Sequence, residues 1–269
     1  MSEPVVWFED AEAADVLCAG GKGASLAAMT AAGLPVPPGF VVRAEVLEQS
    51  VDTDRLRALA RGGDHTGAEA LVREAAAPPE VASAYERLGG PVAVRSSACA
   101  EDSEAASFAG QQETYLYVSG ADEVARRVVD CWASFFSARA LFYRSKKGSL
   151  DDLRIAVVVQ QMVEPKKSGV LFTADPVQRR RDQMIAEAVF GLGEQVVSGQ
   201  VTPDHYVLDR SGAVKREHLV HGGVLDVDEL RELAAMGVRL EQHFGKPQDI
   251  EWAIGDRLYL LQSRPVTTL

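Results

Sequence analysis

Helix-type and strand-type patterns both occur along this chain, which indicates a mixed helix-and-sheet protein with room for two lobes. Its 269 residues lie near the size at which one hydrophobic core usually divides. Apolar residues recur at helical spacing over 122–147. From Ile155 the pattern changes to continuous apolar runs, and two strand-type runs flank Gly255-Asp256. We therefore expect strands to dominate after Ile155.

Charge and hydropathy exclude several classes of partner. The chain has 28 basic and 39 acidic residues and a formal net charge of −11, a sign that opposes general binding to nucleic acid or anionic membranes. No apolar run approaches the ~20 residues needed to cross a bilayer. The acidic N-terminus lacks the features of a signal peptide, so we expect a cytoplasmic protein. An anionic substrate would need local basic residues, with Lys22, Arg95 and Arg264 as candidates.

The three cysteines, Cys18, Cys99 and Cys131, are widely spaced. They form no CxxC pair and no zinc pattern with the five histidines. We expect free thiols. No histidine lies near Cys99 in sequence to activate it, so a structural role is expected there.

Residues 19–33, AGGKGASLAAMTAAG, predict a loose glycine entry followed by a helix over 24–32, with Gly33 at its C′ position. Lys22 then lies where a helix N-terminus could meet an anion. The spacing rejects a Walker A loop, because Leu17 and Gly23 stand where that motif requires glycine and Ser or Thr. The alternative is a surface lysine at a helix start.

The middle of the chain carries fewer signals. Residues 44–90, interrupted at 61–64, predict surface helices without a motif. The aromatic stripe of the helix expected over 122–147 is most simply core packing. The run 155–163 predicts a strand broken by Gln160-Gln161, and Gly169 to Thr173 predicts another.

A strand that runs into small polar residues is the most informative segment. In AVRSSA, beginning at Ala93, Arg95 stands at the junction, and Ser96, Ser97 and Ala98 have little bulk. Backbone N–H groups and hydroxyls there could approach a phosphate, and Arg95 offers a charged planar fork to the same oxygens. The alternative is a charged surface turn. A strand-type segment, Glu113 to Val118, follows.

The C-terminal residues 247–265, PQDIEWAIGDRLYLLQSRP, predict a hairpin whose loop is Gly255-Asp256. That register places Glu251 opposite Leu260 and Asp249 opposite Gln262. Side chains alternate along a strand, so one face is expected to carry Asp249, Glu251, Gln262 and Arg264. The other face is expected to carry Trp252, Ile254, Tyr259 and Leu261.

A carboxylate and an amide oxygen on adjacent strands are hard ligands suited to Mg²⁺ that bridges phosphates. Glu251 and Gln262 are therefore candidate metal ligands, with Arg264 beside them. The alternative is an ordinary exposed polar face. A one-residue slip would reverse every side chain.

Several segments together resemble one family. The stretch 93–118, the GGKGA sequence with the LPVPPGF turn at 34–40, the runs within 168–207 and the terminal DIE…LQSRP are similar to the ATP-binding domain of the pyruvate phosphate dikinase, phosphoenolpyruvate synthase and rifampicin phosphotransferase family. The resemblance covers nearly the whole chain, except 44–90 and 210–240.

The resemblance implies an α+β ATP-grasp fold in which residues 1–269 form one nucleotide-binding unit of two lobes, with Mg²⁺ as cofactor. It implies a catalytic role for Arg95 and Arg264 and metal or nucleotide binding by Glu251 and Gln262. VVVQQMVEP resembles the family's adenine-contacting hinge, although Gln160 could be a plain edge-strand residue. The implied ATP-binding residues are Lys22, Arg95, Gly110, Thr114, Gln160, Val163, Glu251, Gln262 and Arg264.

Members of the family cleave ATP to AMP and phosphate and pass the β-phosphoryl group to a histidine on a separate domain. No histidine here, among His65, His205, His218, His221 and His243, lies in such a phospho-carrier segment. We therefore expect the nucleotide half of a dikinase-type phosphotransferase, whose phosphohistidine domain is on a partner or on missing C-terminal segments. The alternatives are a free-standing ATP-grasp kinase or ligase acting on a small molecule, and a non-catalytic nucleotide-binding module. The final acceptor is not encoded in these motifs.

Overall fold

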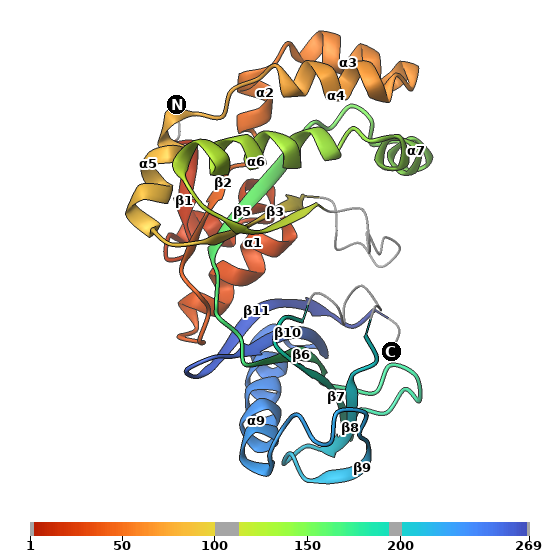
Figure 1. Cartoon of the computed structure of the whole chain (residues 1–269). Helices are drawn as coiled ribbons and strands as arrows, with labels where there is room; N and C mark the ends of the chain where they lie inside the picture. The colour runs from red at the N-terminus through yellow and green to blue at the C-terminus, as the bar shows by residue number, and fades with distance from the viewer. Residues whose placement is uncertain (1–2, 100–112, 194–200, 268–269) are drawn as a thin grey trace. The chain divides into compact units, whose positions relative to one another are not determined.

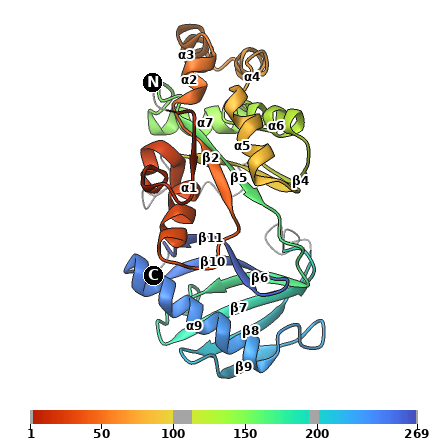
Figure 2. The ribbon, with the colours of Figure 1, turned by 90° about the vertical axis from the view of Figure 1, so that its left-hand side faces the viewer.

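The computed structural model describes residues 3–99, 113–193 and 201–267. The chain divides into two compact units, one of residues 1–28 and 38–162 and the other of 29–37 and 163–269. Figures 1 and 2 show that each unit combines helices with a sheet, and the strands of both sheets pair antiparallel. The chain is therefore α+β, as expected.

The first unit is built on a five-stranded sheet with the strand order β1-β2-β5-β3-β4. Its strands are β1 (Val5–Trp7), β2 (Gly39–Val42), β3 (Val92–Ala98), β4 (Thr114–Val118) and β5 (Ile155–Gln161). The polar residues Ser96 and Ser97 lie inside β3, so the strand extends beyond the end expected at Arg95. It does so because both residues pair with β5, at Val157 and Ala156.

Helices cover both faces of this sheet, with α1 (Val16–Ala31) on one face and α6 (Ala121–Ser134) on the other (Figure 1). The main core lies on the α6 side, where Val94, Val157 and Val159 of the sheet join Val128 and Trp132 of α6 in one buried cluster. The remaining helices are η1 (Ala11–Ala14), α2 (Val46–Ser50), α3 (Thr53–Gly62), α4 (His65–Arg73), α5 (Pro79–Leu88) and α7 (Ala138–Lys147).

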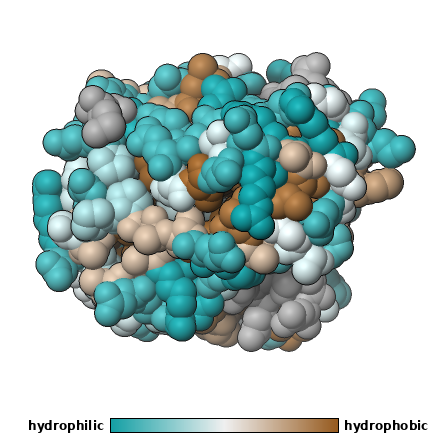
Figure 3. Space-filling model, turned by 90° about the horizontal axis from the view of Figure 1, so that it is seen from above, coloured by the Kyte–Doolittle hydropathy of each residue, from teal (hydrophilic) through white to brown (hydrophobic). Residues whose placement is uncertain are grey.

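The surface seen from the side of α3, α4, α6 and α7 is mostly hydrophilic, with a few hydrophobic side chains near its centre (Figure 3). The break at Gly63 between α3 and α4 agrees with the sequence, because Gly63 has a left-handed φ of 72° and Asp64 caps α4 through Gly67 N–H. The helices of 44–90 are thus amphipathic and pack their apolar faces inward, as expected of surface helices.

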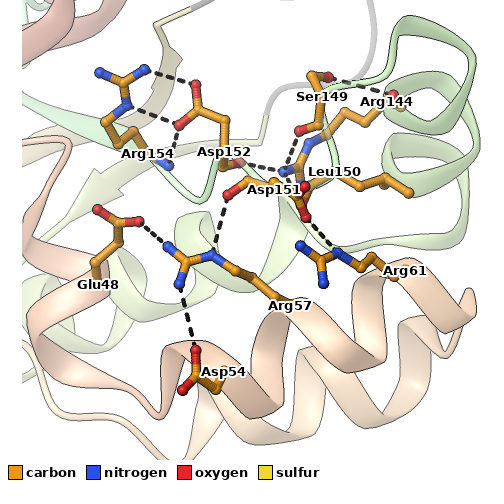
Figure 4. Close-up of polar contacts among 10 residues, drawn as sticks. All are labelled: Glu48, Asp54, Arg57, Arg61, Arg144, Ser149, Leu150, Asp151, Asp152 and Arg154. Atoms are coloured by element: carbon orange, nitrogen blue, oxygen red, sulfur yellow. Dashed lines mark hydrogen bonds and ion pairs between the residues drawn. The ribbon is translucent and has the colours of Figure 1, made fainter.

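The single helix expected over 122–147 is wrong. The structure has α6 and α7, and Ser137 begins α7 by accepting a hydrogen bond from Ala140 N–H. Arg144, only 3% exposed, explains the turn that follows, because its guanidinium donates to the carbonyls of Ser149, Leu150 and Asp152 (Figure 4). It also donates to the carbonyl of Phe135. The loop is also tied to α3 by Arg57 and Arg61, which both bond Asp151 (Figure 4).

The second unit contains a six-stranded sheet with the order β11-β10-β6-β7-β8-β9 and one long helix, α9 (Val227–Phe244). The strands are β6 (Lys167–Phe172), β7 (Gln183–Phe190), β8 (Asp204–Asp209), β9 (Val214–His218), β10 (Gln248–Ile254) and β11 (Leu258–Pro265). Asp226 and Glu229 form a capping box at the start of α9.

The long helix α9 covers one face of this sheet (Figure 2). A Cβ added to Gly237 of α9 would lie 2.7 Å from Leu171 and 3.2 Å from Thr173, so the helix approaches β6 closely there. The face of Leu171, Ile250 and Trp252 is therefore the packed one. The opposite face carries Asp249 and Glu251 of β10 and Gln262 and Arg264 of β11. No helix in the described ranges is both long and apolar enough to span a membrane.

Candidate functional site

In the first unit, the sheet face that α1 covers carries three of the expected residues. Arg95 and Ser97 lie on this face of β3, whereas Val94 and Ala98 belong to the core on the other face. Thr114 of β4 lies directly opposite Arg95, so it projects on the same side. Gln160 of β5 lies opposite Ala93, which shares this face with Arg95.

These side chains differ in exposure. Arg95 is 8% exposed and Gln160 3%, while Thr114 is exposed. Arg95 and Gln160 both have polar partners. Polar groups that share one sheet face can act together on a ligand.

Lys22 of α1 is held against β3 by hydrogen bonds at both ends. Its Nζ donates to Ser96 O at 2.9 Å, and its backbone N–H donates to Ser97 Oγ at 3.1 Å. The structure thus brings Lys22 next to the strand of Arg95. It does not support a phosphate-facing hydroxyl on Ser96, because that hydroxyl alternates onto the core face and has no hydrogen-bond partner among the described residues.

The loose glycine entry expected before Lys22 is reduced to a kink, because α1 spans Val16–Ala31 and contains the whole GGKGA sequence. One residue, Gly20, leaves helical geometry with φ 67° and ψ 174°. Lys22 therefore lies in the first turn after a kink. Gly33 follows the end of α1 with φ 66°, and its N–H donates to Thr30 O, as expected of a C′ glycine.

The three cysteines are free thiols, as expected. Burial raises the pKa of Cys18 to about 11, and burial also raises the pKa of Cys131. Cys99, partly exposed, contacts Leu17 O. A high pKa makes a thiol a poor nucleophile at neutral pH, so Cys18 and Cys131 are structural.

Two further residues, Gly110 and Val163, are expected to take part in nucleotide binding. Gly110 lies outside the described residues. Val163 lies two residues after the end of β5 and is the first residue of the segment 163–269 of the second unit. It is partly exposed.

In the second unit, the C-terminal hairpin has a different register from the expected one. Ile254 pairs with Leu258, so the loop has three residues, Gly255 to Arg257, and not two. A bulge then shifts the register between Glu251 and Trp252, which places Glu251 opposite Gln262 and Asp249 opposite Arg264. The expected pairs of Glu251 with Leu260 and Asp249 with Gln262 are wrong.

The extra loop residue and the bulge together shift the register by two positions, which preserves the face of each side chain beyond the bulge. Asp249, Glu251, Gln262 and Arg264 therefore share one face, as expected. The opposite face is only partly as expected. Trp252 and Ile254 lie there with Leu260 and Leu258, whereas Tyr259 pairs with Ala253 on the face of Glu251.

Asp249, which is mostly buried, forms an ion pair on this face with Arg264, which is exposed. Arg264 Nε and Nη2 each lie 2.8 Å from Asp249 Oδ2. Burial is the main cause that raises the pKa of Asp249; Arg264 opposes the rise, and Glu251 and Glu187 add to it. The negative charges of Glu251 and Glu187 therefore both act on the carboxylate of Asp249.

Glu187 of β7 was missed by sequence reasoning. It lies opposite Val170, which in turn lies opposite Glu251, so Glu187 and Glu251 project from the same face of the sheet. His205 Nδ1 lies 3.5 Å from Glu187 Oε1. The alternation along β7 could have identified Glu187 in the sequence, because this charged residue stands between two alanines. In the structure both alanines, Ala186 and Ala188, are fully buried.

The oxygen donors on this face suit a magnesium ion that takes most of its ligands from water and phosphate. Glu251 supplies a carboxylate, and Gln262, directly opposite it, supplies an amide oxygen. Within the described ranges, no group of three or more His, Cys, Asp or Glu side chains could hold a metal ion.

The sequence matches the family model described as pyruvate phosphate dikinase, AMP/ATP-binding domain, over residues 16–222 and 212–269. It is 42% identical to a probable phosphoenolpyruvate synthase of Archaeoglobus fulgidus, over 99% of this chain and 42% of that protein. It is also 42% identical to a rifampicin phosphotransferase of a Streptomyces species, over 98% of this chain and 36% of that protein. The chain spans less than half the length of these relatives.

Solved structures with a likeness to the chain include D-alanyl-alanine synthetase A from Vibrio cholerae. It is 12% identical with a TM-score of 0.41, over 96% of this chain and 57% of that one. Such a weak likeness carries no argument about function, whereas the sequence matches do. The chain belongs to the family of the pyruvate phosphate dikinase AMP/ATP-binding domain.

Proposed function

We propose that this chain is the ATP-grasp nucleotide-binding unit of a dikinase-type phosphotransferase. In the proposed reaction, ATP and water yield AMP and phosphate, and the β-phosphoryl group passes to a histidine on a separate domain or partner. Residues 1–269 act as one nucleotide-binding unit. Family membership supports the proposal, together with one structural observation.

That observation is the cationic face of the first unit's sheet. Lys22 is bonded to β3 by both its Nζ and its backbone N–H, at Ser96 and Ser97, the two residues that follow the buried Arg95. A guanidinium that is largely removed from water interacts strongly with an anion. In a protein with a net charge of −11, this local concentration of positive charge favours a polyphosphate.

The proposed roles follow from the chemistry of each group. Arg95 and Arg264 stabilise the charge that develops during phosphoryl transfer, because planar guanidinium groups bind phosphate oxygens in a bidentate manner. Lys22 binds a phosphate as a point charge. Gln160 and Val163 contact the adenine, and Gly110 and Thr114 contribute to the nucleotide site.

Glu251 and Gln262 would hold Mg²⁺. When bound, this ion would bridge phosphate oxygens and neutralise their charge. Asp249 holds the guanidinium of Arg264 on the same face through Oδ2. That contact orients Arg264 relative to Gln262, its neighbour but one on β11.

The acceptor histidine is proposed to lie outside these residues. His65 belongs to α4 and His243 to α9, where each is part of a regular helix. His221 Nε2 lies 2.9 Å from Thr202 O, and His205 contacts Glu187. Since the relatives are more than twice as long as this chain, their remaining length offers room for a phosphohistidine domain.

The experiment is ATP turnover by the purified chain, with and without the phosphohistidine domain of one of these relatives. ATP labelled at the β-phosphate is followed by chromatography and mass spectrometry. We expect very slow hydrolysis by the chain alone, because no acceptor is held in line at near-attack distance. Adding the domain should produce AMP and acid-labile phosphate on its histidine.

A domain in which that histidine is replaced by alanine is the matched control and should not accelerate AMP formation. Rapid formation of ADP by the isolated chain, with phosphate on a small molecule, would contradict the proposal and favour direct kinase chemistry. Binding of ATP without turnover in any pairing would also overturn it.

A further inference from the structure

The kink at Gly20 creates a helix start inside α1. Gly20 has φ 67° and ψ 174°, so helical geometry resumes with Gly21, Lys22 and Gly23. The first N–H groups of any helical segment have no partner within that segment. Usually the side chain of the residue before the helix accepts the N–H groups of the second or third residue. Gly20 has no side chain to do so.

Ser97 supplies the missing acceptor from β3. Its Oγ accepts hydrogen bonds from Lys22 N–H at 3.1 Å and Gly23 N–H at 3.3 Å, and it donates to Ala19 O at 2.9 Å. A hydroxyl has one donor and two acceptor sites, so all of its capacity is used. Ser97 is fully buried, and water does not compete for these bonds.

The geometry explains why residue 20 is a glycine. A Cβ added there would lie 2.3 Å from both Ser97 O and Ser97 Oγ. No real Cβ approaches an oxygen so closely. The hydroxyl of Ser97 therefore occupies the space in which a capping side chain at position 20 would stand.

We propose that Ser97 is the positioning residue of Lys22, acting as a helix cap provided by another strand. The role rests on the proposed function, in which Lys22 binds a phosphate. Arg95 lies on the same face of β3, two residues earlier, so the cap fixes the spacing between the two cations. Groups that bind a transferring phosphoryl group need such fixed placement.

The first test needs no nucleotide. Amide hydrogen exchange of Lys22 and Gly23 is measured by NMR in the full chain. We expect Ser97→Ala to raise the exchange rates of these two amides by about tenfold or more, because they lose their buried acceptor. Ser96→Ala is the matched control, because the Ser96 hydroxyl has no hydrogen-bond partner in the part of the chain that the structure describes. It should leave both rates unchanged.

A second variant, Gly20→Ala, disturbs the contact between α1 and Ser97 from the side of the helix. Gly20→Ala should raise the same exchange rates, because its Cβ would collide with Ser97. Gly63→Ala carries a similar positive φ of 72° but has nothing within 4 Å of the new Cβ, so it controls for backbone strain alone. Unchanged exchange at Lys22 and Gly23 in folded Ser97→Ala or Gly20→Ala would overturn the cap.

The positioning role is tested by a double-mutant cycle on Mg-ATP affinity. Ser97→Ala should weaken binding about tenfold in the wild-type background and have no further effect in a Lys22→Ala background. Equal losses in both backgrounds would show a general structural effect and overturn positioning. If the wild-type chain bound no Mg-ATP, the proposed function would fail, while the exchange measurement would still decide the cap.

Discussion

Arg264 contacts Asp249 through a single carboxylate oxygen, with its Nε and Nη2 each 2.8 Å from Oδ2. The two residues are cross-strand partners in the C-terminal hairpin. The Asp249 side chain is 11% exposed and the Arg264 side chain 53%, so the acid is buried while the base reaches solvent. This asymmetry gives the pair a definite pH dependence.

Asp249→Asn tests that dependence. Because the pKa of Asp249 is raised in the folded protein, chiefly by burial, its carboxyl favours folding while protonated. That contribution is lost as the pH rises through the folded pKa. We expect the variant to equal or exceed wild type in free energy of unfolding at pH 8. The difference should vanish below about pH 4, the range of an unfolded aspartate. Urea titrations at several pH values measure it.

Asp256→Asn in the loop of the same hairpin is the control with the opposite sign. The hydrogen bond from Tyr259 lowers the pKa of Asp256, so its contribution is present above the unfolded pKa and lost as the pH falls. This variant should lose a little stability at pH 8 and none at low pH. A loss of stability at pH 8 in Asp249→Asn as well would contradict the sign given for Asp249.

Glu251→Gln keeps the size of the side chain and removes its charge. If Glu251 binds Mg²⁺ with Gln262, the Mg²⁺ concentration that half-saturates ATP binding should rise about tenfold or more, with little change in the melting temperature. Calorimetry at graded Mg²⁺ concentrations measures the shift. A variant that unfolds while its Mg²⁺ dependence stays intact would make this hairpin face purely structural.

Arg144→Met should destabilise the first unit. Methionine fills much of the same volume but removes the donor to the partly buried carbonyls of Phe135, Ser149, Leu150 and Asp152. We expect a loss of about 2 kcal/mol or more in the free energy of unfolding. Arg61→Met, which removes a solvent-exposed pair with Asp151, should change it little. Similar stabilities of the two variants would disprove the anchoring role of Arg144.

Alkylation should distinguish the three thiols. At pH 8 we expect iodoacetamide to modify Cys99 first, because Cys18 and Cys131 are buried and the pKa of Cys18 is about 11. After denaturation all three should react. Peptide mapping by mass spectrometry reads the order, and early modification of Cys131 in the folded protein would contradict the structure.

The C-terminal hairpin shows how much of the candidate metal-binding face could be predicted from the alternation of side chains along its strands. The shared face of Glu251 and Gln262 was predictable, because strand alternation survives any register shift of two positions. Tyr259 was assigned to the wrong face, since neither the three-residue loop nor the bulge beside Trp252 has a local sequence signal here. Both are features of the pairing between β10 and β11.

The kinked helix α1, in contrast, has a feature that could not be predicted from its local sequence. Glycines at 20, 21 and 23 predict a loose segment, yet only Gly20 leaves helical geometry. The acceptor that stabilises this helix start is Ser97, distant in sequence, and no local pattern reveals a partner in another strand. The break between α6 and α7 was missed for a related reason, since a strong apolar period hid the cap at Ser137.

The central claim is that the face of Lys22 and Arg95 binds ATP, and titration calorimetry with Mg-ATP tests it most directly. The wild-type chain should bind without a partner. Arg95→Ala should bind about tenfold more weakly or worse, because charge-assisted phosphate contacts are worth about 1.5–3 kcal/mol each. Arg55→Ala, a change at an exposed arginine of α3, should bind as wild type does. Wild-type affinity in folded Arg95→Ala would contradict the account.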